Sequence, residues 1–251
     1  MRLLITGGSS EIGTAIALKR FRMGDEIVFT GTSEASVEKT LQAYRELGVA
    51  AIGLVLDLSQ TDAAPSATRA ALKLGFGGLI LNAASRVARL KRFHEHSSAD
   101  WEESLRTNIE GNLWLIQSCL PGMMAAAFGR IVFVSSLSSV NGTSRYPLYC
   151  LEKAAMEGLM VNLAVDYGQE GILCNTLRLG IIATERNRRF WKRGHFAEKM
   201  EAVIPQGRFG TPGEVAEAID PLLSRTSYVN GSVLTVSGGL PGMRSQGILG
   251  V

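Results

Sequence analysis

Seven short apolar segments, each separated from the next by enough residues to form a helix, constrain the fold of this chain most. They read RLLIT, EIVFT, AIGLVL, GLILN, RIVFVS, ILCNTL and SVLTV. Apolar runs of this length are typical of strands that helices cover on both faces, as in parallel sheets. The alternation predicts an α/β fold, a doubly wound parallel sheet of about seven strands with right-handed crossovers.

Two of the intervening segments carry helix boundaries. Ser33 precedes EASVEKTLQAYRELG as an N-cap, and Gly48 ends that segment. Thr211 and Pro212 mark a second helix start before GEVAEAIDPLL. Because no repeat, low-complexity tract or linker divides the sequence, we expect residues 1–251 to form a single domain.

Composition excludes several classes of function. With 46% hydrophobic residues the 251-residue chain can bury one sizeable core, and a formal charge of +3 without a basic stripe argues against nucleic-acid binding. No uncharged run approaches the roughly 18 residues of a membrane span, and no signal-type apolar region follows the first residues. The three cysteines, Cys119, Cys150 and Cys174, lie far apart, which is typical of a reducing compartment. We therefore expect a cytoplasmic protein.

The stretch TGGSSEIG lies directly after the first apolar segment and before the helical AIALKRF. Ligands of doubly wound sheets bind beyond the carboxyl ends of the strands. Glycines at this place permit a tight turn and let a pyrophosphate approach the N-terminus of the next helix. Gly7, Gly8 and Gly13 therefore predict a dinucleotide site, although glycine-rich turns between strand and helix also occur for steric reasons alone.

The segment YCLEK places Tyr149 and Lys153 at positions i and i+4 of one helix face. A nearby ammonium favours the phenolate form of a tyrosine, which makes the phenol a better acid-base group at neutral pH. The spacing is common by chance. It gains meaning from SSLSS, which brings hydroxyl groups to the end of the IVFVS segment.

The loop resembles the TGxxxGxG cofactor loop of the short-chain dehydrogenase/reductase family, with Glu11 in place of the middle glycine. That family has its catalytic serine thirteen residues before the tyrosine, which selects Ser136 here. Asn108, in RTNIEGN, matches the helix asparagine of the family. The resemblance thus implies a catalytic set of Asn108, Ser136, Tyr149 and Lys153, with no metal, in a Rossmann fold.

The resemblance covers nearly the whole chain. Further matches are Asp57-Leu58, the sequence NAA where the family has NAG, and IPQGRFGTPGEVA before VSGG. The family's PG after strand six is Leu179-Gly180 in this sequence. It implies cofactor contacts by Gly7, Ser9, Ser10, Ile12, Gly13, Thr32, Ser33, Asp57, Leu58, Asn82, Ala83, Ala84, Tyr149, Lys153, Gly180, Ile182 and Thr184. Glu11 is expected to point sideways into solvent, away from phosphate.

The resemblance implies hydride transfer between a nicotinamide and a substrate carbonyl, with Tyr149 as proton donor. Ser136 would bond the carbonyl oxygen, Lys153 would assist the tyrosine and hold the nicotinamide ribose, and Asn108 would position a water. The second strand ends in FTGTSE, in which hydroxyls of Thr32 and Ser33 precede the first acid. Since an acid at this place selects NAD, we expect NADP(H), with NAD(H) as the alternative.

The pattern is similar to bacterial 3-oxoacyl carrier-protein reductases, which implies a 3-oxoacyl thioester substrate in fatty-acid or polyketide-type biosynthesis. A lid is expected over about residues 181–205. Its aromatic residues, which would cover an apolar substrate, are Phe190, Trp191 and Phe196. Its basic residues, which would contact an acidic carrier protein or CoA, are Arg186, Arg188, Arg189, Lys192 and Arg193. A solvated basic helix face is the alternative reading of the same residues.

Two other functions stay open. An NAD-dependent dehydrogenase of a sugar, polyol or other secondary alcohol would use the same residues, and a noncatalytic dinucleotide sensor would not need them. We also expect a homotetramer, because the helix from Tyr149 onward is apolar around most of its circumference. The resemblance implies a four-helix contact made by this helix and the one before it, and Met160 is the residue we expect to face the partner.

Overall fold

The computed structural model describes residues 1–83, 90–185, 188 and 194–240. Its seven strands form one parallel sheet in the order β3-β2-β1-β4-β5-β6-β7, as the apolar segments predict. Their bounds are β1 Arg2–Ile5, β2 Glu26–Gly31, β3 Ala51–Val55, β4 Gly78–Leu81, β5 Gly129–Ser136, β6 Ile172–Leu179 and β7 Val233–Val236. The strand order reverses between β1 and β4, which in this class of sheet is where ligands bind.

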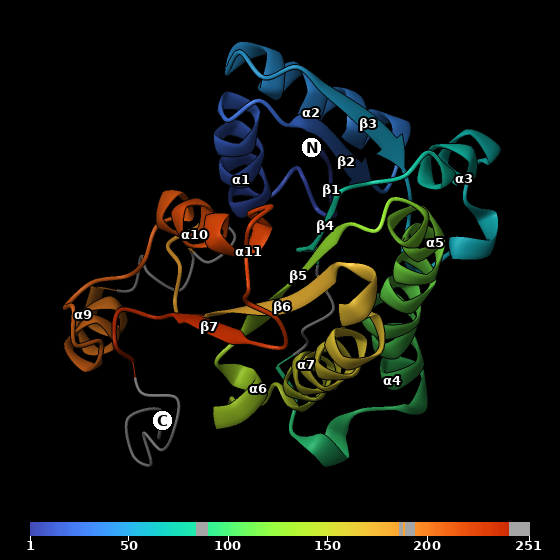
Figure 1. Ribbon diagram of the computed structural model, residues 1–251. Coiled ribbons are helices and arrows are strands. Elements are labelled where there is room, and N and C mark those ends of the chain that lie inside the picture. Colours follow the sequence, from blue (N-terminus) through green and yellow to red (C-terminus); the bar gives the residue numbers. More distant parts are fainter. Residues whose placement is uncertain (84–89, 186–187, 189–193, 241–251) are drawn as a thin grey trace.

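Helices cover the sheet on both faces (Figure 1). On one face lie α1 Glu11–Arg22, α2 Glu34–Glu46, α10 Pro212–Ala218 and α11 Asp220–Leu223. The other face carries α3 Ser66–Lys73, α4 Ser98–Leu105, the π-helical turn η3 Arg106–Glu110, α5 Gly111–Ala125 and α7 Pro147–Tyr167. Shorter elements are η1 Thr61–Ala63, η2 Phe93–Glu95, α6 Ser138–Asn141 and η4 Gly168–Glu170, and α9 Gly194–Val203 follows the segment after β6.

The predicted helix boundaries are confirmed at the two places named above. Ser33 caps α2, and its side chain accepts the N–H of Ser36 at 3.2 Å. Thr211 forms a capping box with Glu214 at the start of α10. These side-chain acceptors satisfy N–H groups that a helix start leaves without partners.

Each face of the sheet has its own core. Leu4, Leu79 and Ile131 point to one face, together with Leu115 of α5 and Met160 of α7. Alternate positions of the same strands point to the other face, where α1, α2 and α10 pack. This pleat explains why the strands are apolar along their whole length. In the described part of the chain, no helix is long and apolar enough to cross a bilayer.

The junction between the end of β3 and the start of α5 leaves no room for a side chain. A Cβ atom at Gly111 would lie 2.2 Å from the carbonyl oxygen of Leu58. Replacing Gly111 by alanine should therefore lower the free energy of unfolding by about 1–3 kcal/mol, because α5 must move away from the sheet. Urea unfolding followed by circular dichroism measures the change.

Gly213→Ala is the matched control. Its Cβ would have Thr211 Oγ1 at 3.8 Å as its nearest neighbour, on an exposed helix turn. Here alanine should raise the free energy of unfolding by up to about 1 kcal/mol, since it removes the excess backbone entropy of glycine. Equal effects of the two substitutions would contradict the packing argument.

Candidate active site

The loop between β1 and α1 makes a tight turn in which glycine is required. Gly7 has a φ of +64°, and a Cβ atom at Gly13 would lie 2.5 Å from the Gly7 carbonyl oxygen. Ser10 caps α1: its Oγ accepts the N–H of Gly13 at 3.0 Å and donates to the Gly7 carbonyl at 2.9 Å. Ser9 and Ser10 are exposed on the outer side of this loop, and Ile12 packs partly against the core behind it.

Two side chains hold the loop carbonyls toward the protein. Asn82, directly after β4, donates from Nδ2 to the carbonyls of Thr6 and Gly7, each at 3.1 Å. The Tyr44 hydroxyl, whose pKa burial raises, donates to the Gly8 carbonyl at 2.8 Å. In a trans peptide the N–H of the next residue points the opposite way, so the N–H groups that follow these carbonyls point away from Asn82 and Tyr44. Such a loop at a helix N-terminus fits the phosphates of a dinucleotide.

Glu11 is exposed, as expected, and its carboxylate also has a partner in the protein. Its Oε2 accepts the backbone N–H of Glu185 at 2.5 Å, so the carboxylate turns toward the segment that follows β6. The contact joins the start of α1 to the chain beyond Thr184. The residue that replaces a family glycine thus binds a neighbouring backbone group.

The ends of β2 and β3 carry the residues expected at the adenosine side. Thr32 and Ser33 are exposed after β2, and the Ser33 hydroxyl is engaged as the α2 cap. Asp57 is half-buried and accepts the N–H and the hydroxyl of Ser59, at 2.9 and 2.7 Å. The Leu58 side chain is 7% exposed and lies in the core, so only its backbone remains for a cofactor.

The chain after β6 carries three further residues expected to contact the cofactor. Gly180 donates its N–H to Val236 at 2.8 Å, and Ile182 is buried and forms a parallel bridge with Gly210. Thr184 is half-buried. Asn82 and Ala83 are half-buried beside the Gly7 turn, whereas the expected contact Ala84 lies outside the described residues.

The hydroxyl groups and the ammonium predicted from YCLEK and SSLSS belong to β5 and α7. Ser136 ends β5, and its Oγ contacts Ser138 Oγ and accepts the Ser138 N–H, both at 3.2 Å. Tyr149 lies in the first turn of α7, half-buried. Lys153 Nζ is 5.7 Å from the centroid of the Tyr149 ring and donates to the Val134 carbonyl of β5 at 2.9 Å. The lysine therefore lies between the tyrosine and the sheet.

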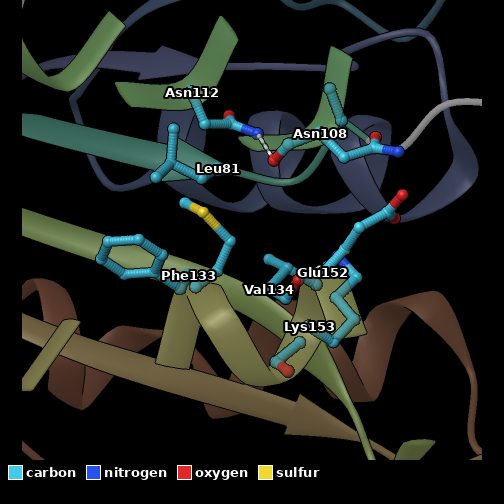
Figure 2. Close-up of a pocket in the computed structure, with 10 residues that line it drawn as sticks. Leu81, Asn108, Asn112, Phe133, Val134, Glu152 and Lys153 are labelled. Atoms are coloured by element: carbon cyan, nitrogen blue, oxygen red, sulfur yellow. Dashed lines mark hydrogen bonds between the residues drawn. The ribbon is translucent and has the colours of Figure 1, made fainter. Parts of the chain in front are cut away.

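Asn108 occupies a π-helical turn between α4 and α5, a feature that is frequent at functional sites. The N–H of Gly111 reaches back five residues to the Arg106 carbonyl. The Asn108 carbonyl accepts a bond from the Asn112 side chain at 2.8 Å. The turn brings Asn108 over α7, where its side chain faces Glu152 (Figure 2).

A small cavity lies between Asn108 and Lys153 (Figure 2). It has about 20 Å³ of space for the centre of a water molecule, enough for one ordered water. Its walls are Leu81, Ala83, Asn108, Asn112, Phe133, Val134, Ser135, Glu152, Lys153 and Met156. Among the described residues, Asn112 Oδ1 is buried there without a hydrogen-bond partner.

Two acids of α7 that were not predicted from the sequence contact this region. Glu152 is 4% exposed and accepts a bond from the Ser104 hydroxyl of α4. Glu157 accepts bonds from Ser135 at 2.6 Å and Ser139 at 2.8 Å, and pairs with Arg178 of β6 at 2.5 Å. Glu157 therefore joins the strand end that carries Ser136 to α7 and β6. An acid inside YCLEK, in a mostly apolar helix, was the available signal for Glu152.

Several basic and aromatic residues were expected in the lid. Among them, the structure describes the side chain of Arg188 alone. Arg188 is exposed and pairs with Glu185 at 2.6 Å. The segment expected to form the lid, about residues 181–205, contains helix α9. In the part of the chain that the structure describes, no group of three His, Cys, Asp or Glu side chains is arranged to hold a metal ion.

The chain is similar to known proteins over most of its length. The family model described as Enoyl-(Acyl carrier protein) reductase matches residues 7–241. The 3-oxoacyl-[acyl-carrier-protein] reductase FabG of Aquifex aeolicus is 33% identical over 242 residues, 94% of this chain and 96% of that protein. Gluconate 5-dehydrogenase of Gluconobacter oxydans is 30% identical over 242 residues, 95% of this chain and 94% of the relative.

A solved structure is similar over the same length. The gluconate 5-dehydrogenase of Burkholderia cenocepacia in complex with NADP and tartrate superposes with a TM-score of 0.84 at 28% identity, over 95% of this chain and 94% of that one.

The Glu157 network should make stability depend on acid pH. Burial alone would raise the pKa of Glu157, but the bonds from Arg178, Ser135 and Ser139 and the charge of Arg178 lower it. A lowered pKa gives stability that is present above the ordinary glutamate pKa and is lost as pH falls through the folded value. Glu157→Gln should cost about 1–3 kcal/mol at pH 7 and lose less stability on acidification.

Urea unfolding of wild type and variant between neutral and acid pH measures both effects. Glu38→Gln, in an exposed pair with Arg45, is the control and should cost no more than about 1 kcal/mol. A Glu157→Gln difference that stays constant with pH would contradict the assignment of the network.

Proposed function

Because this chain belongs to the short-chain dehydrogenase/reductase family, we propose that it reduces the carbonyl of a 3-oxoacyl thioester to a secondary alcohol with NADPH. Members of this family are NAD(P)-dependent oxidoreductases, and this chain is one of them. The observation that carries the proposal is the position of Lys153 between Tyr149 and the end of β5, where Ser136 lies.

Each residue of the catalytic set then has its own role. The nicotinamide, when bound, supplies the hydride to the carbonyl carbon. Tyr149 donates its phenolic proton to the carbonyl oxygen, and the Ser136 hydroxyl donates a hydrogen bond to the same oxygen. Lys153 stabilises the phenolate that remains. Asn108 orders a water in the cavity beside Lys153.

The preference for NADP rests on the end of β2. Thr32 and Ser33 are exposed there, and the acid that would repel a 2′-phosphate is displaced to Glu34, inside α2. The NADP in the solved gluconate 5-dehydrogenase is consistent with this choice for the present chain. The loop residues Ser9, Ser10, Ile12 and Gly13 would hold the pyrophosphate.

The choice of a 3-oxoacyl thioester, on CoA or a carrier protein, rests on the similarity to the Aquifex aeolicus reductase. The gluconate 5-dehydrogenases favour the alternative, oxidation of a sugar acid or polyol, with the same residues acting in reverse. Residues about 181–205 would form the lid over either substrate. A noncatalytic dinucleotide sensor would bind NADPH and turn over neither.

Steady-state kinetics with acetoacetyl-CoA and with gluconate decide between these functions. We expect turnover of acetoacetyl-CoA with NADPH, and a kcat/KM for NADPH at least about tenfold above that for NADH, a difference of 1.4 kcal/mol. Tyr149→Phe should lower kcat by about 10²–10⁴-fold while the Kd of NADPH, measured by fluorescence, changes little. Tyr167→Phe, at the far end of α7, is the control. A tenfold preference for NADH would refute the cofactor assignment.

We also propose a homotetramer, on the basis of two separate exposed apolar surfaces. Helix α7 exposes Leu151 at 45%, Val161 at 50% and Val165 at 75%. The edge strand β7 exposes Val233 and Leu234. Two different surfaces, each paired with its own copy by a twofold axis, generate a tetramer. Met160, which we expected at the contact, is instead fully buried against the sheet, so the partner-facing residues are the exposed Leu151, Val161 and Val165.

Val165→Glu tests this assembly. Light scattering coupled to gel filtration should give the wild type a mass well above the 27.0 kDa of one chain, and the variant a smaller mass. Leu74→Glu, which is 70% exposed on the end of α3, is matched in exposure and should leave the mass unchanged. A monomeric wild type would refute the proposal.

We propose a cytoplasmic location on the basis of the three cysteines. Cys119, Cys150 and Cys174 are all free thiols, and two of them are buried. Thiols persist in a reducing compartment.

A further inference from the structure

Glu152 is a buried acid in the middle of the proposed site, and the proposed chemistry gives it no role. It lies on α7 between Tyr149 and Lys153, with 4% of its surface exposed. Glutamate is almost never buried to this extent unless it is paired. Burial of Glu152 therefore destabilises the fold, and its presence must be explained by something other than stability.

The groups around Glu152 leave its charge only partly compensated. From α4 the Ser104 hydroxyl donates to Oε1, and from the π turn Asn108 offers its neutral side chain. On its own helix the titratable neighbours are Tyr149, one turn earlier, and Lys153, whose charge acts on the carboxyl. From α5 and β5 the nearby polar side chains are Asn112 and Ser135, which are neutral.

This environment favours the protonated form of the Glu152 carboxyl. Burial raises the pKa of Glu152, while the bonds from Ser104 and Asn108 and the charge of Lys153 act in the opposite direction. A carboxyl with a raised pKa keeps its proton to higher pH than an ordinary glutamate does, and can then give that proton to a neighbouring group.

The cavity connects Glu152 to Lys153. Both residues line it, together with Asn108 and Asn112. Asn112 is 5% exposed, and its Oδ1 is buried without a partner among the described residues, so one water in the cavity would satisfy this acceptor. Such a water would touch the carboxyl of Glu152 on one side and the region of Lys153 on the other.

We propose that Glu152 is a proton-relay residue that restores the proton of Tyr149 after each reduction. This inference rests on the proposed function. The Tyr149 O–H bond breaks as the substrate alcohol forms. Lys153 then gives a proton to the phenolate and regains one from the cavity water, which takes its replacement from the Glu152 carboxyl. Glu152 becomes a carboxylate, held by Ser104, Asn108 and Lys153, and is reprotonated from solvent. No electrons move in these steps, and alcohol oxidation runs them in reverse.

Glu152→Gln keeps the size of the side chain and its bonds to Ser104 and Asn108, but it cannot ionise. With saturating NADPH and acetoacetyl-CoA, the variant should lose at least about tenfold in kcat, while KM changes little. One ionisation should also disappear from the pH profile of kcat. Glu152→Asp should restore part of the rate. Glu103→Gln, exposed on α4, is the control for loss of a nearby carboxylate. A Glu152→Gln enzyme with wild-type kcat and pH profile would overturn the proposal.

Direct titration provides a second readout that does not depend on turnover or on the variant folding. Carbon NMR of glutamate-labelled wild-type protein without cofactor should show one carboxyl titrating above the ordinary range. Ser104→Ala should raise that value further, because the Ser104 bond favours the carboxylate. If every glutamate titrates in the ordinary range, the proposal is wrong.

The outcomes also separate this inference from the proposed function. If gluconate with NADP is turned over and acetoacetyl-CoA is not, the substrate proposal fails, and the Glu152→Gln comparison is made on gluconate. If neither is turned over, the proposed function fails, and the titration alone then decides the relay: a Glu152 carboxyl that titrates in the ordinary range overturns it.

Discussion

The hydroxyl of Thr6 joins the two central strands at the place where the strand order reverses. Its Oγ1 accepts the N–H groups of Asn82 and Ala83, both at 2.9 Å, and contacts the Ile80 carbonyl at 3.3 Å. Thr6 is fully buried, so water does not compete for these bonds. Asn82 in turn fixes the Gly7 carbonyl. The glycine loop and the end of β4 therefore form one rigid unit, and every ligand contact proposed above is positioned relative to it.

Helix α7 holds two acids five residues apart in contrasting environments. Glu157 faces the guanidinium of Arg178 and two serine hydroxyls, and its pKa is lowered. Glu152 faces mainly neutral groups, and its pKa is raised. The environment of Glu157 thus favours the ionised form, as suits a structural anchor, and that of Glu152 favours the protonated form. The difference comes from the partners on neighbouring elements, since both acids belong to the same helix.

The sequence was sufficient to predict the seven strands, because doubly covered parallel strands are apolar without interruption, and two helix starts, because their caps are chemically distinctive. It could not predict which face of α7 is buried. That helix is apolar around most of its circumference, so the pattern does not indicate which face packs on the sheet. Met160 was therefore predicted to face a partner subunit, although it is buried against the sheet. The burial of Glu152 depends on Ser104, which lies 48 residues away in sequence. The partner of Glu11 similarly comes from beyond β6.

The π-helical turn Arg106–Glu110 sets the rotational phase between α4 and α5. The π-helical turn contains one residue more than the α-helical turn that would replace it. Each residue of an α-helix corresponds to a rotation of about 100° about the helix axis. Deletion of a single residue from the turn would restore a continuous α-helix and turn all of α4 by that angle relative to α5. The Ser104 hydroxyl would then leave α7, and Glu152 would lose its donor. The geometry of the buried acid therefore depends on the length of this segment as much as on the identity of its residues.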